Sequence, residues 1–117
     1  MSTVIGFSNL AQGSASVSEA SQTAALIAAP GAGKSLRLIG GVVCVTLAAT
    51  GGGGVVSIKD GTTVIFSANA SAAGNVPFFF GEQGYLVTAN TAINVVAESA
   101  TTNEASANVA ATAKVIG

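Results

Sequence analysis

Apolar and polar residues alternate along much of this chain with the two-residue period of β-strands. The longest alternation covers residues 105–115, where every odd-numbered position is Ala or Val. A helix is the competing interpretation of this segment, because alanine is a mediocre strand former. A 3.6-residue period, however, places Asn108 and Thr112 among apolar neighbours and gives no clean apolar stripe. The pattern therefore predicts a strand.

Glycine-containing turns divide the rest of the chain into short strands. Gly40-Gly41 predicts a bend or bulge within a long strand, the four glycines at 51–54 predict a loop, and Asp60-Gly61 predicts a type I′ hairpin turn. No segment has the pattern of an amphipathic helix. The expected strands cover residues 23–28, 35–47, 55–59, 62–67, 75–80, 84–88, 92–98 and 105–115. About eight short strands separated by turns predict an all-β fold, an antiparallel β-sandwich that is jelly-roll-like.

The first 20 residues differ from the rest of the chain. They open with a short apolar cluster: Val4, Ile5, Phe7 and Leu10. The run at 12–16, Gln-Gly-Ser-Ala-Ser, is typical of a flexible linker. We therefore expect an N-terminal arm over residues 1–20 and a sandwich domain over residues 21–117. The arm would either add an edge strand to its own sandwich or reach a neighbouring subunit.

Charged residues make up only 8% of the chain, whereas 50% of it is hydrophobic. A typical soluble domain carries about a quarter charged residues. Ser, Thr and Asn could supply the polar surface instead, but the high apolar fraction favours a surface that is covered by other subunits. A net charge of −1 also lacks the basic face that a nucleic-acid-binding protein needs, so we expect no nucleic-acid partner.

Residues 38–58 form an uncharged stretch that is long enough to be tested as a membrane span. Six of these 21 residues are glycine, four of them consecutive at 51–54. Glycine costs about 1 kcal/mol relative to alanine in a helix interior. Two strands joined by a glycine loop explain the segment better, and we expect no membrane partner.

Residues 30–35, Pro-Gly-Ala-Gly-Lys-Ser, end like a phosphate-binding loop. The full pattern has a glycine at the position of Ala28 and a helix that begins at the lysine. Here the following residues, 36–41, are typical of a strand, so no helix N-terminus would face a phosphate. We interpret Lys34 as part of a polar turn, and a nucleotide-binding or nucleotide-hydrolysing enzyme as the alternative.

Few other residues could carry catalysis. The chain has no histidine, which removes the commonest general base and metal ligand. Asp60 is explained by its place in the predicted turn, and no two carboxylates have the spacing of a catalytic pair. Cys44 lies among β-branched residues and is expected to be a buried small hydrophobic residue. We therefore expect no enzyme activity, no catalytic residues, no cofactor and no metal.

The run Phe78-Phe79-Phe80 must place at least one ring on each face of a strand. One face belongs to the core. The other is either an exposed aromatic patch or a contact with another subunit, and we favour the contact.

Several segments, taken in order, resemble a known group of proteins. Residues 24–38 read Ala-Ala-Leu-Ile-Ala-Ala-Pro-Gly-Ala-Gly-Lys-Ser-Leu-Arg-Leu, and a Lys-Asp-Gly-Thr hairpin follows at 59–62. Gly-Tyr-Leu-Val-Thr at 84–88 and Ala-Ile-Asn-Val at 92–95 close the series. In this order the chain resembles small virion proteins of tailed bacteriophages, of the capsid decoration (cement) type or the head or tail fibre type, over residues 23–116. The four-glycine run and the triple phenylalanine depart from the common pattern.

The resemblance implies a structural protein without catalytic residues, a β-sandwich assembled as a homotrimer. We therefore expect a decoration protein on the capsid surface of the virion, which stabilises a bacteriophage head by bridging subunits of the major capsid protein. A fibre or tail module that binds a surface carbohydrate is the alternative. The residues expected at interfaces are Val4, Ile5, Phe7, Leu10, Phe78, Phe79, Phe80 and Tyr85.

Overall fold

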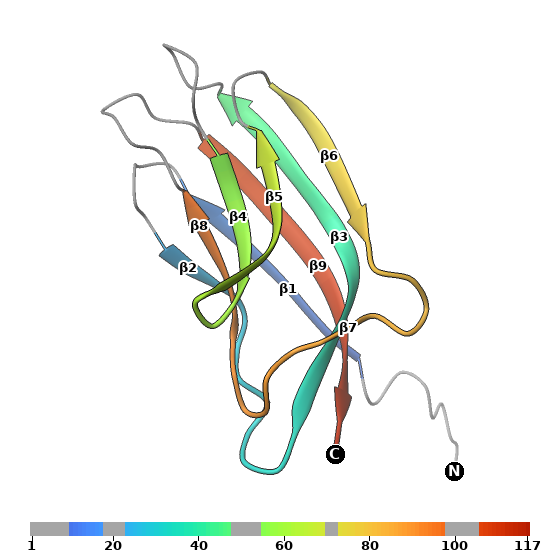
Figure 1. The fold of residues 1–117 in the computed structure, drawn as a ribbon. Coiled ribbons are helices and arrows are strands. Elements are labelled where there is room, and N and C mark those ends of the chain that lie inside the picture. Colours follow the sequence, from blue (N-terminus) through green and yellow to red (C-terminus); the bar gives the residue numbers. More distant parts are fainter. Residues whose placement is uncertain (1–9, 18–22, 48–54, 70–72, 98–105) are drawn as a thin grey trace, which may run out of the picture.

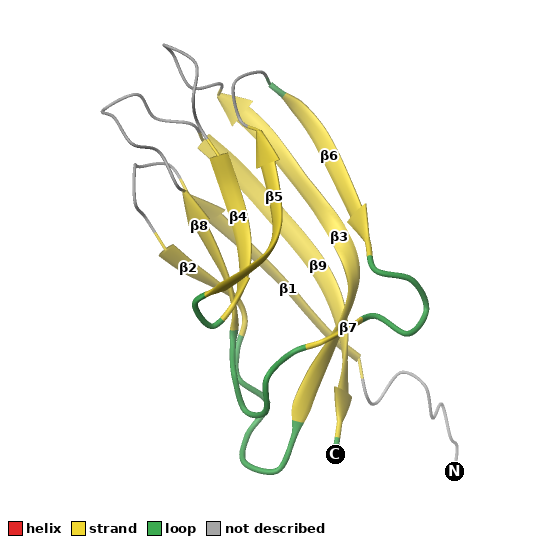
Figure 2. Ribbon diagram, viewed as in Figure 1, coloured by secondary structure: helices red, strands yellow, loops and turns green. Residues whose placement is uncertain are grey.

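The structure, a computed structural model, describes residues 10–17, 23–47, 55–69, 73–97 and 106–117. Within these ranges the chain forms strands and no helix (Figure 2). The described residues therefore contain no helix that is long and apolar enough to cross a membrane. The strands are β1 (Leu10–Val17), β2 (Thr23–Ile27), β3 (Ser35–Leu47), β4 (Val55–Asp60), β5 (Thr63–Asn69), β6 (Gly74–Phe79), β7 (Tyr85–Leu86), β8 (Ile93–Ala97) and β9 (Ser106–Ile116).

The strands form two antiparallel sheets that face each other (Figure 1). The five-stranded sheet has the order β1-β9-β3-β6, and the short β7 pairs with the first part of β3. The four-stranded sheet has the order β2-β8-β4-β5. From β1 to β4, successive strands alternate between the two sheets, which is a jelly-roll-like strand order. The expected antiparallel sandwich is confirmed.

The two-residue alternation sorts side chains between the core and the outer surfaces. In β9, the odd-numbered positions from Ala107 to Ala113 are buried, whereas Asn108 and Lys114 are exposed. The helix alternative for this segment is therefore wrong. The core between the sheets consists mainly of branched aliphatic side chains, among them Val17, Leu36, Leu38, Val43, Val56, Ile58, Val87, Ile93, Val95 and Val109.

The bend or bulge expected at Gly40-Gly41 within β3 is a β-bulge, which lies one residue earlier. The pairing of β3 with β9 shifts between Leu38 and Gly40, so that Ile39 is the extra residue. One extra residue reverses the faces of a strand. Even-numbered positions such as Leu36 are buried before the bulge, and odd-numbered positions such as Val43 are buried after it. The bulge therefore allows 13 residues to remain one strand across the sandwich.

The β4–β5 hairpin turns one residue later than expected. Asp60 is the last residue of β4 and pairs with Thr63, so the turn consists of Gly61 and Thr62. Gly61 has a φ of 61°, and the two residues beside it do not have positive φ. The expected type I′ turn is wrong, because it needs positive φ at both central residues. Positive φ at the first central residue alone is the pattern of a type II′ turn.

The N-terminal part of the described chain also differs from the expectation. Residues 10–17 form β1, which pairs with β9 along its whole length, and Val17 is fully buried. The expected flexible linker at 12–16 is therefore wrong. A Cβ on Gly13 would lie 1.9 Å from the carbonyl oxygen of Leu26, so the glycine lets β1 lie close against β2. Of the expected arm, residues 1–9 and 18–20 lie outside the described residues.

Candidate interaction surface

The outward side of the five-stranded sheet, which we call the outer face, carries most of the exposed large apolar side chains. The described residues include four such side chains. Phe79, Leu86 and Ile116 project from the outer face with exposed fractions of 70%, 54% and 38%, while Val64 lies on β5 of the other sheet. Large apolar side chains that gather on one face are typical of an interaction surface.

The register of the strands explains why these side chains point outward. Phe79 pairs with Gly40, and Phe78, the next residue along β6, pairs with Gly41 and is buried. Leu86 pairs with Arg37, whose side chain also points away from the core. Directly paired residues lie on the same side of a sheet, so Phe79 and Leu86 both belong to the outer face.

A groove of about 700 Å³ crosses one end of the outer face. Its floor and walls combine apolar side chains with charged ones. It is lined by Leu10, Arg37, Ile39, Phe79, Glu82, Gln83, Thr112, Lys114 and Ile116. We call this feature the charged groove.

A second hollow of about 640 Å³ lies farther along the same face. Its lining consists mainly of small residues: Gln12, Gly13, Ser14, Gly41, Val42, Ala110, Ala111 and Thr112. We call it the small-residue trough. A Cβ on Gly41 would lie 2.0 Å from the carbonyl oxygen of Ala110, so close strand packing requires the glycine there. Thr112 lines both hollows, so they are adjacent on the outer face.

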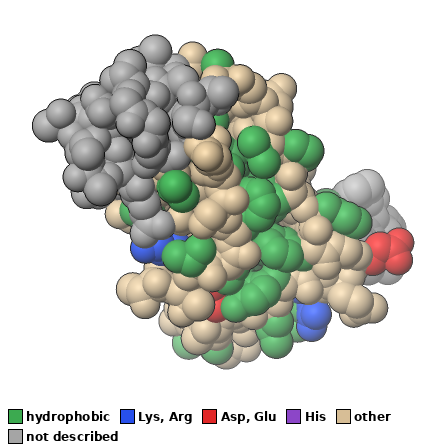
Figure 3. Space-filling model, turned by 45° about the horizontal axis from the view of Figure 1, so that its top comes forward, with side chains coloured by type: hydrophobic (Ala, Val, Ile, Leu, Met, Phe, Trp, Pro, Cys, Tyr) green, Lys and Arg blue, Asp and Glu red, His purple; other side chains and the backbone are tan. Residues whose placement is uncertain are grey.

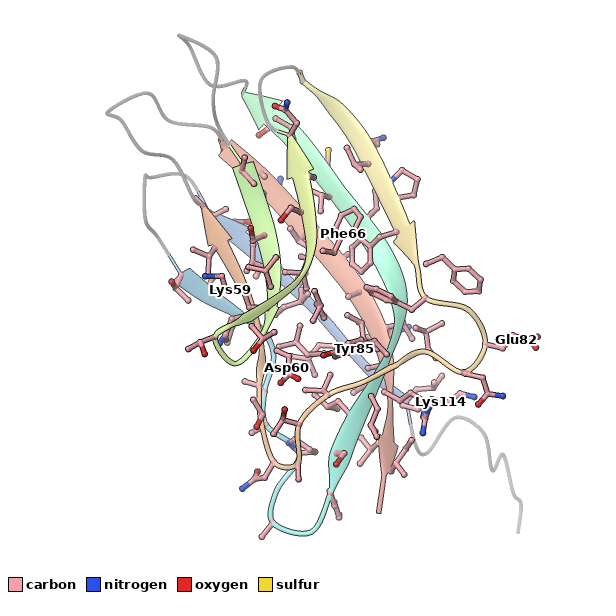
Figure 4. The ribbon with its side chains drawn as sticks, viewed as in Figure 1. Lys59, Asp60, Phe66, Glu82, Tyr85 and Lys114 are labelled. Atoms are coloured by element: carbon pink, nitrogen blue, oxygen red, sulfur yellow. The ribbon has the colours of Figure 1, made fainter. Side chains whose placement is uncertain are left out.

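The loop between β6 and β7 is held against β3 by hydrogen bonds. The Arg37 guanidinium donates through Nη1 to the carbonyl oxygen of Gln83 at 3.0 Å, and the backbone N–H of Phe80 donates to Ile39 at 2.8 Å. Figure 4 shows Glu82 on this loop, pointing away from the sandwich, and Lys114 on β9. Both side chains are exposed, so the charged groove has an acid on the loop side and a base on the β9 side.

A row of aromatic rings fills the side of the sandwich between β5 and β6. The rings of Phe66 and Phe78 stack with centroids 4.9 Å apart, and Phe80 lies 6.0 Å from both Phe78 and Tyr85. In Figure 3, hydrophobic side chains form a band down the middle of the molecule on this side. The row closes the gap between two sheet edges that are not hydrogen-bonded to each other.

The residues expected at interfaces are therefore divided between several places. Leu10 lines the charged groove, and Phe79 is the exposed ring of the triplet. Phe78 is only 6% exposed and belongs to the core, while Phe80 and Tyr85 are half-buried in the aromatic row. Val4, Ile5 and Phe7 lie outside the described residues. The expectation that the triplet shows a ring on each side of its strand is confirmed.

Sequence reasoning missed two apolar residues of the outer face, Leu86 and Ile116, and the charges beside them. Ile116 extends the alternation of β9. It could have been found from the sequence, because it is two residues beyond Lys114 and therefore lies on the same side of the strand. Cys44 was expected in the core, but it is only half-buried on the outer face, since it pairs with Asn108. The outward position of Leu86 could not be found from alternation, because β7 is only two residues long.

Lys34 lies in a turn, as the sequence predicts. Its backbone N–H donates to the carbonyl oxygen of Gly31 at 3.1 Å, and β3 begins at the next residue. Asn90, whose φ is 49°, accepts from the Gly31 N–H at 2.9 Å and donates its own N–H to the Lys34 carbonyl oxygen at 2.8 Å. No helix follows, so the arrangement does not form a phosphate-binding loop.

Asp60 has a different environment from the expected one. The residue is 7% exposed, and its Oδ2 accepts from the backbone N–H of Thr88 at 3.1 Å and from the Thr88 hydroxyl at 3.0 Å. The explanation from turn chemistry is therefore wrong, because Asp60 joins the end of β4 to the segment after β7. The described part of the chain holds no group of three His, Cys, Asp or Glu side chains that could bind a metal ion.

Comparisons with known proteins add a likeness of fold. No protein-family model matches the chain, and no curated protein matches it in sequence. A chain of the cyanophage Pam1 capsid asymmetric unit superposes on it with a TM-score of 0.55 and 19% sequence identity. The match covers 90% of this chain and 82% of that chain. The two chains therefore share a fold over most of their lengths.

Proposed function

We propose that this chain is a structural protein of a bacteriophage particle, a decoration (cement) protein that binds the capsid surface and bridges neighbouring subunits. The observation that carries the proposal is the likeness of fold, at a TM-score of 0.55 over 90% of this chain, to a chain of a cyanophage capsid. The exposed apolar side chains of the outer face support it, because such a cluster is typical of a surface that meets another protein.

The size of the similar chain supports an accessory role. The superposed part is 90% of this 117-residue chain and 82% of the other, so the other chain has about 130 residues. Each is the size of a single domain. A single small domain suits a protein that is added to a shell.

The proposal includes self-association into a homotrimer. With 8% charged residues, the surface offers little charge repulsion between copies. The outer face also presents apolar side chains beside opposite charges, a combination that favours defined contacts over random ones.

The segment of residues 1–9 is the proposed strap to the major capsid protein. It contains Val4, Ile5 and Phe7, and nine extended residues reach at most about 30 Å. Burying three such side chains contributes roughly 5–9 kcal/mol. Ordering nine residues costs roughly 9–18 kcal/mol, so the segment needs backbone hydrogen bonds from a neighbour as well. Added as an edge strand on a capsid subunit, it would obtain them.

The carbohydrate-binding alternative has less support from the aromatic side chains. Sugar recognition stacks an aromatic face against the sugar ring, and Phe66, Phe78, Phe80 and Tyr85 instead pack against one another, which leaves Phe79 as the one exposed ring among the described aromatic residues. The proposed role involves no catalytic step and no cofactor.

The experiment is a deletion of the gene in the phage that carries it, followed by thermal challenge of the purified particles. We expect particles without the protein to release DNA at a lower temperature, and purified wild-type protein to restore the loss when added back. A variant that lacks residues 1–9 should fold and self-associate but restore much less. Particles that are equally stable without the protein, or that never contained it, would contradict the proposal.

A further inference from the structure

Phe79 occupies an unusual position at the edge of the five-stranded sheet. β6 is an edge strand, and the residue opposite Phe79 on β3 is Gly40, which has no side chain to pack beside the ring. The ring is 70% exposed, while the equally large Phe78 beside it is buried. Phe79 therefore projects from the edge of the outer face as an apolar knob.

The small-residue trough is a matching hollow on the same face, but the knob of the same molecule does not line it. The trough is centred on β9 and β1, and β9 is two strand spacings, roughly 10 Å, from β6. Side chains as small as those of Ala110 and Ser14 leave room there for a ring from another molecule. The knob and the trough are different patches of one surface.

The two charges lie on opposite sides of the charged groove, which Phe79 also lines. Glu82 lies on the β6–β7 loop, close in sequence to the knob, and Lys114 lies on β9, two residues beyond Thr112 of the trough. Hydrogen bonds from Arg37 to Gln83 and from Phe80 to Ile39 hold the loop in place before any contact forms. A preformed loop loses little entropy when it binds.

We propose that copies of this chain associate through this pair of patches, with Phe79 of one copy in the small-residue trough of the next and its Glu82 beside Lys114 of that copy. The inference rests on the self-association in the proposed function and specifies its surface. Because each copy gives its Phe79 to the trough of the next copy, the proposed contact is heterologous, and a heterologous contact closes into a ring where the rotation between copies divides a full turn. Three copies would make the ring of the proposed homotrimer.

The area of the outer face limits the size of such a contact. β9 has 11 residues, which at about 3.3 Å per residue gives a length of roughly 36 Å. Four strands at about 4.8 Å spacing give a width of roughly 19 Å, hence an area of roughly 700 Å². A standard stable interface buries about 800 Å² per partner. Each contact of a ring covers only part of this face and is therefore smaller than the standard size.

The test is a disulfide that forms only between different copies. In a Cys44→Ser background, Glu82→Cys protein is mixed with Lys114→Cys protein under mild oxidation. We expect a cross-linked pair that contains one copy of each, and little cross-linking when either variant is oxidised alone. Thr23→Cys mixed with Ser67→Cys, both exposed on the four-stranded sheet, is the matched control and should give no such product.

Substitutions test the same contact by its affinity, measured by sedimentation. Phe79→Ser should weaken self-association at least tenfold, whereas Val64→Ser, which removes a similarly exposed side chain from β5, should leave it unchanged. Glu82→Lys and Lys114→Glu should each weaken it several-fold, and the double variant should recover most of the loss.

The outcomes separate this inference from the proposed function. A wild-type chain that stays monomeric would overturn both the inference and the homotrimer of the proposed function. A missing mixed cross-link, or a Phe79→Ser variant that behaves like Val64→Ser, would overturn the inference alone and leave the decoration role to the particle experiment. A ring that cross-links as expected but never attaches to particles would leave the inference standing and overturn the proposed function.

Discussion

Replacing Phe78 and Phe79 one at a time separates the core of the sandwich from its outer face. The two phenylalanines are neighbours on β6, but Phe78 is 6% exposed and Phe79 is 70% exposed. Phe78→Ala removes a ring that packs between Phe66 and Phe80. Phe79→Ala removes a ring of the same size that touches mainly solvent in a single copy.

The structure sets the size of each effect. A buried Phe→Ala substitution costs about 3–5 kcal/mol, because it removes apolar contact and leaves a cavity. Phe78→Leu keeps much of the apolar volume but loses two ring contacts of about 0.5–1.5 kcal/mol each, so we expect about 1–3 kcal/mol. Phe79→Ala should change the free energy of unfolding of a single copy by less than about 0.5 kcal/mol.

These losses fall within the stability expected for the whole chain. A domain of 117 residues is stable by roughly 6–18 kcal/mol, so Phe78→Leu should still fold even if Phe78→Ala is marginal. For a chain of this length, a loss of 3–5 kcal/mol lowers the Tm by roughly 12–20 °C. We predict that the wild type and Phe79→Ala are equally stable, that Phe78→Leu is less stable than both, and that Phe78→Ala is the least stable.

The assay is urea unfolding monitored by far-UV circular dichroism. Intrinsic fluorescence is less suitable, because the chain has no tryptophan and a single tyrosine. Low protein concentration keeps self-association from adding to the apparent stability. An equal loss for Phe78→Ala and Phe79→Ala would refute the assignment of one ring to the core and the other to the surface. A loss below about 1 kcal/mol for Phe78→Ala would refute the structural role of the aromatic row.

Three further substitutions test the rest of the fold, each by the same unfolding measurement. Gly13→Ala should destabilise by about 3 kcal/mol or more, because its Cβ would lie 1.9 Å from the carbonyl oxygen of Leu26, and wild-type stability would contradict the close approach of β1 to β2. Asp60→Ala should cost about 2–3 kcal/mol through the loss of both hydrogen bonds from Thr88, and a change below about 0.5 kcal/mol would show that these bonds do not matter. Lys34→Ala should change stability by less than about 0.5 kcal/mol, since its side chain is exposed in a turn, and ATP binding abolished by this substitution would restore the nucleotide-binding alternative.

Alternation along the chain was sufficient to predict most of the strands, because each sheet has one buried and one outward side. It failed for β1, where glycine and serine occupy three of the eight positions and Val17 is the one β-branched residue, although β-branched side chains mark a strand. Position 13 requires glycine because the strand lies against the carbonyl oxygen of Leu26, and this contact is between parts of the chain that are distant in sequence. The bulge at Ile39 likewise depends on the pairing of β3 with β9, which local sequence does not reveal.

The candidate site was only partly predictable for the same reason. The triplet of phenylalanines required a ring on each side of its strand, but the register with Gly40 and Gly41 decides that Phe79 is the exposed one. The trough and the charged groove join residues from β1, β3, β9 and the β6–β7 loop. Their proximity follows from the jelly-roll-like strand order, in which strands distant in sequence become neighbours.

Electron cryo-microscopy of phage particles with and without this chain tests the central claim most directly. The proposed role predicts that wild-type particles carry regular density on the outside of the capsid, that the sandwich fits this density, and that deletion of the gene removes it. Added purified protein should return the density to the same places. Capsid density that is identical in the two kinds of particle would contradict the proposed function.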